Sequence, residues 1–257
     1  AAHGAPRGMG PAPSAAVATP AGYTLFFASD QILTVNPILY EKLSFSLEDF
    51  QPLVLVSKSP HVLLVIPAFP ASNLAELVTY SKSKPAGLNF GSGGQGTSPH
   101  LAGELFKGRA GINLTHVPYR GAALSVTALL GGEIQILFDS TLTAIGHIRS
   151  GRTRGLAIAS SARSASLPDL PTFSESGYPG FEAAVSHGLL LPARTPADRV
   201  AALSKILNEI LNDPAYRKQM TELGAQVIGG SPEDFRSYLV AERKKWAEVI
   251  RRQNIRI

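Results

Sequence analysis

The chain has 257 residues, 44% of them hydrophobic, with no cysteine and a formal net charge of +5 at neutral pH. This length and apolar content allow one large domain or two small ones, each with a sizeable core. Without cysteine, a disulfide scaffold and a thiolate metal site are excluded. The basic residues are dispersed and cluster only at 243–245 and 251–252, on a predicted amphipathic helix. A solvated helix face explains these clusters, so we predict no nucleic-acid partner.

The first twenty residues are rich in Ala, Gly and Pro and contain no apolar segment typical of a secretory signal. They predict a poorly ordered or damaged segment. No apolar run in the chain approaches the roughly 18 residues that a membrane span needs. We therefore expect neither a signal peptide nor a membrane span in the chain as given.

Strands alternate with helices through the first two thirds of the chain. Residues 23–28, 53–56 and 62–66 are rich in β-formers, and residues 72–81 have the spacing of an amphipathic helix. Three strand–helix units follow, with strands at 88–90, 112–117 and 134–138 and helices reaching to 107, over 122–130 and near 142–149. A further strand is expected at 155–159. This alternation is typical of a parallel α/β sheet, with the loops after the strands at one edge.

Helices dominate the remainder. A short strand at 189–191 precedes a helix that Thr195 should cap and that carries an apolar stripe from Val200 to Leu211. Asp213 and Pro214 start another helix, which Gly224 ends. The sequence Ser231-Pro-Glu-Asp234 resembles a capping box for the last helix.

A glycine-rich loop follows the strand at 88–90. The segment reads NFGSGGQGTSPH, and its glycines 91, 93, 94 and 96 permit positive φ angles and close approach of a ligand. Ser98 is expected to cap the next helix, with Pro99 at its first position. The loop amides and the helix dipole favour an anion, and the Ser92 and Thr97 hydroxyl groups are expected to add donors.

The same loop matches the dinucleotide pattern G-x-G-x-x-G. That pattern requires an acidic residue at the end of the next strand, where this chain has Pro118-Tyr119-Arg120. Arg120 would suit a 2′-phosphate, so an NADP-dependent oxidoreductase stays open as an alternative. A bare turn without ligand is the third interpretation. Catalytic motifs are otherwise absent from the sequence: it has no G-x-S-x-G, H-E-x-x-H or G-K-[ST] pattern. We predict a protein that is not an enzyme, with no cofactor and no metal.

Several separated motifs together resemble one family. They are the segment from Asn89 to Asp139, LPDLPT at 167–172, GYPGF at 177–181, LPARTP at 191–196, and upstream GYTLF at 22–26 and NPILY at 36–40. In this order they resemble the substrate-binding proteins of tripartite tricarboxylate transporters, the TctC or Bug family, from about Gly22 to the C-terminus.

The resemblance implies a two-lobed α/β fold of the type II periplasmic-binding-protein kind, with parallel-rich sheets flanked by helices. One lobe would combine 1–60 with 188–257, the other would span 61–187, and the chain would cross near 62–67 and 188–192. The family normally has a signal peptide, a first strand and a further glycine loop before the segment matching Gly22. We therefore expect the first strand of the N-terminal lobe to be missing, and a remnant that does not bind stays open.

The resemblance also implies the function. A small organic carboxylate, such as a di- or tricarboxylate, would be captured in the cleft between the lobes and passed to the membrane components of the transporter, in the periplasm. Backbone groups at Tyr119 and Gly121 would assist the glycine loop. The Arg120 side chain would clamp a carboxylate, or would only brace its own lobe through a backbone carbonyl. Asp139, after the strand at 134–138, would meet a hydroxyl, an ammonium or water, or would only cap a helix. The candidate ligand-binding residues are Ser29, Gly91, Ser92, Gly94, Gly96, Thr97, His100, Tyr119, Arg120, Gly121, Asp139 and His187.

Ser29 stands where the family has a hydroxyl residue, but departures from the family pattern lie beside it and at His187. Asp30, next to Ser29, replaces a small neutral residue and would weaken a carboxylate site if it faced the ligand. Ser186 and His187 stand where relatives often carry two aromatic residues, so the ligand of a relative cannot be assumed. For His100 a role in closing the helix turn is the alternative to ligand contact.

Overall fold

A computed structural model describes residues 11–256 and divides them into two compact units. Unit 1 comprises the described residues up to Lys58, Ser186–Met220 and the residues from Gln226 onward. Unit 2 comprises Ser59–Val185 and Thr221–Ala225. The placement of segment 221–225 in unit 2 could not be read from chain order, because its neighbours on both sides belong to unit 1.

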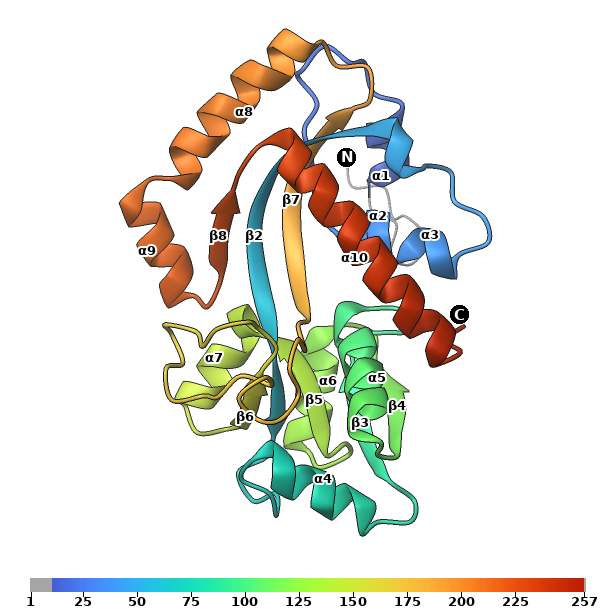
Figure 1. Cartoon of the computed structure of the whole chain (residues 1–257), viewed down its shortest axis with the longest axis vertical. Helices are drawn as coiled ribbons and strands as arrows, with labels where there is room; N and C mark the ends of the chain where they lie inside the picture. The colour runs from blue at the N-terminus through green and yellow to red at the C-terminus, as the bar shows by residue number, and fades with distance from the viewer. Residues whose placement is uncertain (1–10, 257) are drawn as a thin grey trace. The chain divides into compact units, whose positions relative to one another are not determined.

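The parallel strands of unit 2 follow the predicted strand–helix alternation. Strands β3 (Leu88–Ser92), β4 (Leu114–Pro118) and β5 (Ile136–Ser140) form the order β5-β3-β4, and β3 pairs in parallel with both neighbours. Helices α5 (Ser98–Ala110), α6 (Ala122–Leu130) and α7 (Thr141–Arg149) each follow one of these strands. The strands β3, β4 and β5 therefore end at one edge, where α5, α6 and α7 begin (Figure 1).

The two strands expected at 53–56 and 62–66 are one strand, β2 (Phe50–Val65), so that expectation is wrong. Strand β2 has 16 residues, and its first and second halves pair with strands of different units. In unit 1, Leu55 lies opposite Gly229 of β8 (Gln226–Gly229). In unit 2, Val62 lies opposite Asp139 of β5 and Ile158 of β6 (Arg154–Ile158). Backbone pairing with these strands keeps the polar residues in the middle of β2 in an extended conformation. The β-propensity of these residues does not reveal such partners.

Unit 1 contains a sheet in which β7 (Ala184–Pro192) lies between β1 (Phe26–Ser29) and β2, with β8 on the other side of β2. The pairings of β1 with β7 and of β2 with β8 are antiparallel, so the expected parallel-rich character is wrong for these strands of unit 1. β7 is longer than the strand expected at 189–191. It continues through Gly188, which packs against the Phe235 ring so closely that a Cβ at this position would collide with the ring. The expected helices are present as α8 (Ala197–Leu211), α9 (Pro214–Glu222) and α10 (Pro232–Arg252), and α10 packs against the short helix α2 (Gln31–Thr34).

The poor order expected for the first twenty residues is wrong for residues 11–20; residues 1–10 lie outside the described range. Helix α1 (Ala12–Ala16) forms, and it buries Ala12 and Ala15 in one core with Phe26, Phe50 and Leu239. Pro11 is its N-cap and Pro13 lies in its first turn. Proline is tolerated there because the amides of a first turn have no partner within the helix.

Helix starts show where capping rules apply. Ser231 and Asp234 form the predicted capping box of α10, with Ser231 Oγ accepting from Asp234 N at 3.1 Å. The N-caps of α5 and α8 are Thr97 and Pro196, one residue away from the expected Ser98 and Thr195. The Ser98 hydroxyl is instead engaged in tertiary contacts, since it donates to Ala184 O at 2.9 Å and lies 2.5 Å from His61 Nε2.

The remaining elements complete the two units: α3 (Asn36–Leu39) and the 3-10 turn Leu47–Asp49 in unit 1, and α4 (Leu74–Lys82) in unit 2. Unit 2 buries an aromatic cluster in which Phe106 on α5 makes edge contacts with Phe173 and Phe181. Across residues 11–256, no helix combines the length and the apolar character that crossing a membrane requires.

Candidate functional site

Two loops at the strand edge of unit 2 are tied together. Gly121 N donates to Gly93 O at 3.1 Å, and Tyr119 N donates to Ser92 O at 3.0 Å. The backbones approach so closely that a Cβ on Gly93 would lie 3.0 Å from Ala122 N. The glycine-rich loop after β3 and the loop after β4 therefore form one continuous backbone surface.

This surface carries the N-termini of two helices. The N-caps are Thr97 for α5 and Gly121 for α6, and neither makes a side-chain capping bond. Neither helix has an acidic residue in its first turn. The first amides of a helix lack intrahelical partners and carry the positive end of the dipole, so both ends favour a negative charge beside them.

The loop glycines serve two different purposes. Gly94, Gly96 and Gly121 have φ angles of +143°, +76° and +110°, which L side chains rarely adopt. Gly91 and Gly93, also expected to use positive φ, are absent from the positive-φ glycines among the described residues. They provide space instead: a Cβ on Gly91 would collide with the Ile134 side chain.

The donors that the sequence assigns to a ligand are used inside the loop. Thr97 Oγ1 donates to Gly94 O at 2.7 Å. Ser92 Oγ lies 2.8 Å from Gly94 O, accepts from Gly94 N at 3.1 Å and lies 2.6 Å from His116 Nε2. In this structure these hydroxyl groups shape the loop, so direct ligand contact by Ser92 and Thr97 stays a prediction.

His100 is also turned inward. It is buried on α5, and its Nδ1 accepts a hydrogen bond from Gly96 N at 3.0 Å. Its ring stacks on that of His116 from β4, with centroids 3.7 Å apart. This geometry matches the alternative in which His100 closes the turn, and contact with a ligand stays a prediction.

The second loop offers side chains at its surface. Arg120 is exposed, and no ion pair to it is found within residues 11–256. The Tyr119 hydroxyl donates to Glu133 Oε2 at 3.4 Å, and burial and this carboxylate raise the pKa of Tyr119. Arg120 is therefore available to an anion, whereas the Tyr119 ring lies beside Gly91.

Asp139 is the next-to-last residue of β5, not the residue after the strand as expected. It lies next to the glycine loop, because Gly91 of β3 lies opposite Leu137 of β5. Its Oδ1 accepts from Ser140 N at 2.9 Å and from Thr143 Oγ1 at 2.6 Å. Its Oδ2 is buried, and the described residues offer it no hydrogen-bond partner. Burial raises the pKa of Asp139 to about 6 despite these two donors. The N-cap of α7 is Ser140, so Asp139 supports this helix from one residue before it.

Ser29 and His187 lie together in unit 1, opposite each other in the β1–β7 pair. The Ser29 hydroxyl is buried and has no partner among the described residues. His187 stacks on Phe27, with centroids 5.4 Å apart, and burial lowers its pKa. A role for either residue in ligand binding stays a prediction.

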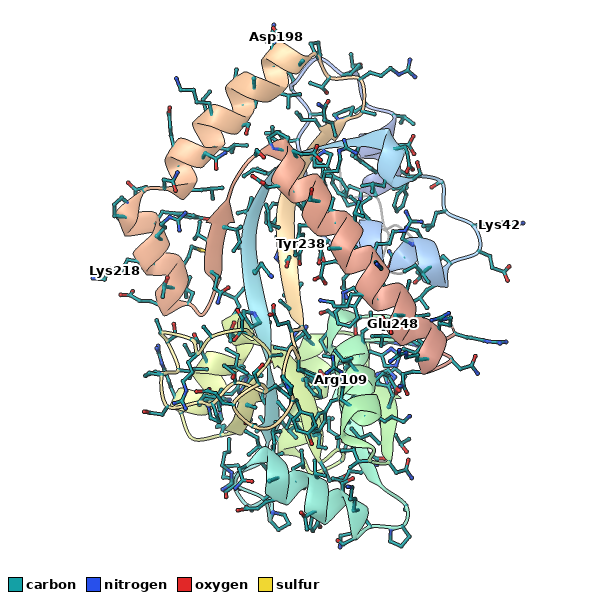
Figure 2. All side chains as sticks on the ribbon, in the orientation of Figure 1. Lys42, Arg109, Asp198, Lys218, Tyr238 and Glu248 are labelled. Carbon is teal, nitrogen blue, oxygen red and sulfur yellow. The ribbon has the colours of Figure 1, made fainter. Side chains whose placement is uncertain are left out.

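Asp30 is buried, with 3% of its surface exposed. Its Oδ1 accepts from Ser186 N at 3.3 Å and its Oδ2 from the Tyr238 hydroxyl at 3.2 Å. Figure 2 labels Tyr238 on α10. The sequence analysis missed this partner, and 208 residues separate the pair. No periodic or motif signal links them.

The chain belongs to the family described as tripartite tricarboxylate transporter family receptor, TctC, whose model matches residues 4–255. The structure has the α/β fold of the periplasmic binding proteins of this family. The predicted family and fold class are thereby confirmed.

Three solved structures are similar over most of their length. The periplasmic binding protein BugD is 32% identical, with a TM-score of 0.82 over 95% of this chain and 83% of BugD. Rpa4515 of R. palustris, solved with adipate, is 29% identical, with a TM-score of 0.88 over 95% and 82%. MatC of Rhodopseudomonas palustris, solved with bound malate, is 29% identical, with a TM-score of 0.80 over 93% and 83%. One of these neighbours is thus described as a periplasmic binding protein, and the other two were solved with adipate and with malate.

Proposed function

We propose that this protein captures a small organic carboxylate at the loops that follow β3 and β4 of unit 2, and delivers it to the membrane components of a tripartite tricarboxylate-type transporter. The observation that carries the proposal is the pair of uncapped helix N-termini on α5 and α6, joined by the Gly121 N to Gly93 O bond. Family membership and the adipate- and malate-bound neighbours support it.

The carboxylate would lie against the first-turn amides of the two helices. Three or four charge-assisted hydrogen bonds, each contributing about 1.5–3 kcal/mol, are consistent with micromolar affinity, near −8 kcal/mol. Arg120, exposed beside the α6 N-terminus, would add a positive charge. Solute capture needs no bond to be made or broken, so the proposal includes no catalysis and no cofactor.

Asp139 would determine which substituents are favoured on the ligand besides its carboxylate. A buried carboxylate repels a second carboxylate unless one of the two is protonated. Its unpartnered Oδ2 would accept a hydrogen bond from a hydroxyl or ammonium group of the ligand. We therefore propose hydroxy- or amino-substituted acids as the preferred ligands near neutral pH.

The cellular compartment is inferred from the class of protein to which the similar structures belong. The neighbours are periplasmic binding proteins, and we propose that this protein works in the periplasm as well. Its membrane partners would be the integral components of one tripartite transporter.

Calorimetry on the purified chain tests the proposal directly. Adipate, malate, citrate, aspartate and NADP⁺ are titrated separately at pH 7.5. Micromolar binding of at least one carboxylate, lost in Gly96→Val, supports the proposal. Binding heat from NADP⁺ with none from any carboxylate would favour the oxidoreductase alternative. No binding heat from any of the five compounds would favour a remnant that does not bind a ligand.

A further inference from the structure

We propose that His100 and His116 are positioning residues: a stacked pair of imidazoles that holds the glycine-rich loop in the shape that presents the α5 N-terminus to a ligand. The inference rests on the proposed function for what the loop binds. It concerns how the loop is held, which is measurable without any ligand.

The pair is built from two elements of unit 2. His100 lies in the first turn of α5 and His116 lies in β4, opposite Phe90 of β3. The imidazole centroids are 3.7 Å apart at 17°, and the Phe90 ring lies 5.0 Å from His116. Stacking on an aromatic ring fixes the plane of each imidazole, and hence the direction of its nitrogens.

Each imidazole contacts a different part of the loop. Gly96 N donates to His100 Nδ1 at 3.0 Å. His116 Nε2 lies 2.6 Å from Ser92 Oγ, which also accepts from Gly94 N at 3.1 Å. Together the two rings hold both ends of the 92–96 turn, including glycines with φ of +143° and +76°.

The His100 contact defines a protonation state. A nitrogen that accepts from an amide carries no proton, so a neutral His100 has its proton on Nε2. Protonating Nδ1 would replace the acceptor by a donor facing Gly96 N–H and break the contact. The loop is therefore held only while His100 is uncharged.

The surroundings keep both rings uncharged. Burial, followed by the nearby Lys107 ammonium, lowers the pKa of His100 to about 4. Burial, followed by His100 and Lys107, lowers the pKa of His116 to about 3. On the same helix Lys107 pairs with Glu104 at 3.4 Å, and burial raises the pKa of Glu104. The loop should keep its shape from neutral pH down to about pH 5 and lose it under stronger acid.

Two substitutions separate positioning from simple packing. In His100→Asn the side-chain carbonyl oxygen takes the place of Nδ1 as an acceptor for Gly96 N. In His100→Leu the volume is kept and the acceptor is removed. His147→Leu, on α7, is the control for replacing a histidine elsewhere in unit 2.

Amide hydrogen exchange and ¹⁵N NMR of the ligand-free chain give the primary readout. We expect the Gly96 amide to exchange at least tenfold faster in His100→Leu. In His100→Asn the exchange rate should return to that of the unsubstituted chain. In the unsubstituted chain, His100 should show the tautomer protonated at Nε2, without a titration step near pH 6.5. Unchanged Gly96 exchange in a folded His100→Leu, or a His100 titration near 6.5, would overturn the proposal. The histidine titration decides alone if the Leu variant does not fold.

Binding of adipate and malate is measured in parallel. We expect affinity to fall at least tenfold in His100→Leu and to recover in His100→Asn. If the unsubstituted chain binds neither acid, the proposed function loses support, while the exchange data still decide on the histidine pair.

Discussion

The Tyr238 hydroxyl donates a hydrogen bond to Asp30 Oδ2 across 3.2 Å, and so joins α10 to the residue that follows β1. Tyr238 also lies 2.7 Å from Ser186 Oγ, and the Lys58 ammonium lies 5.1 Å from the centre of its ring. Burial, with a contribution from Glu242, raises the pKa of Asp30 to about 7, although Lys245 and the hydrogen bonds oppose the shift. Asp30 is thus a component of the unit 1 core, not a free carboxylate.

Asp30 should make stability depend on pH. Its pKa rises from 3.8 to about 7 on folding, so between these values the folded chain retains a proton that the unfolded chain has lost. Its contribution to the free energy of unfolding is complete below pH 3.8 and is lost as the pH rises through about 7. Asp30→Asn should remove this slope and gain on the order of 4 kcal/mol relative to the unsubstituted chain at pH 8, because each pKa unit corresponds to about 1.36 kcal/mol. Urea denaturation at pH 5 and 8 measures the difference. Exposed Asp198→Asn is the control, and equal slopes for both variants would contradict the assignment.

Gly96→Val should abolish carboxylate binding. The φ angle of +76° at Gly96 strains any L side chain, and the bond from its amide to His100 would be distorted. Gly94→Val should act in the same way. Gly146→Ala provides the matched control, because nothing lies within 4 Å of a Cβ in that helical position. It should stabilise α7 by roughly 0.5–1 kcal/mol and leave affinity unchanged. Full affinity in both loop variants would show that the loop does not approach the ligand.

Asp139 should give carboxylate affinity a pH dependence. Its pKa of about 6 means that it is mostly ionised at pH 8, where it repels a second anion. Adipate affinity should therefore rise as the pH falls from 8 to 6, and Asp139→Asn should bind adipate more tightly at pH 8 with less dependence on pH. Malate should lose the acceptor for its hydroxyl group, so its advantage over adipate should shrink. Calorimetry of both acids at both pH values provides the check. An unchanged preference order would leave Asp139 as a support for Ser140 and Thr143 only.

Ser231→Ala should destabilise the protein without affecting the site. The substitution removes the acceptor of Asp234 N and one donor to Asp234 Oδ2, which are both parts of the α10 capping box. A loss of about 1 kcal/mol is expected in thermal or chemical unfolding. Adipate and malate affinities should not change, which distinguishes this variant from those in the glycine loop. A fall in affinity at equal stability would indicate that α10 influences the site.

The sequence by itself determined the family, the strand–helix alternation of unit 2 and the position of the glycine-rich loop. These features are local: the period of apolar residues, the glycines and prolines that end elements, and motifs such as the capping box at Ser231. It also indicated that Asp139 stands at the strand edge beside the loop, because parallel strands end at one edge.

Only the tertiary structure decided how the polar groups are used. Ser92, Thr97 and His100 look like ligand donors along the chain, but folding brings His116 and the carbonyl of Gly94 within reach and engages them in the loop. Asp30 meets Tyr238, and β2 runs unbroken through its polar middle because β8 and β5 pair with its two halves. The physical reason is the same in each case: a hydrogen-bonding group is satisfied by whatever lies close in space, and partners distant in sequence leave no local pattern.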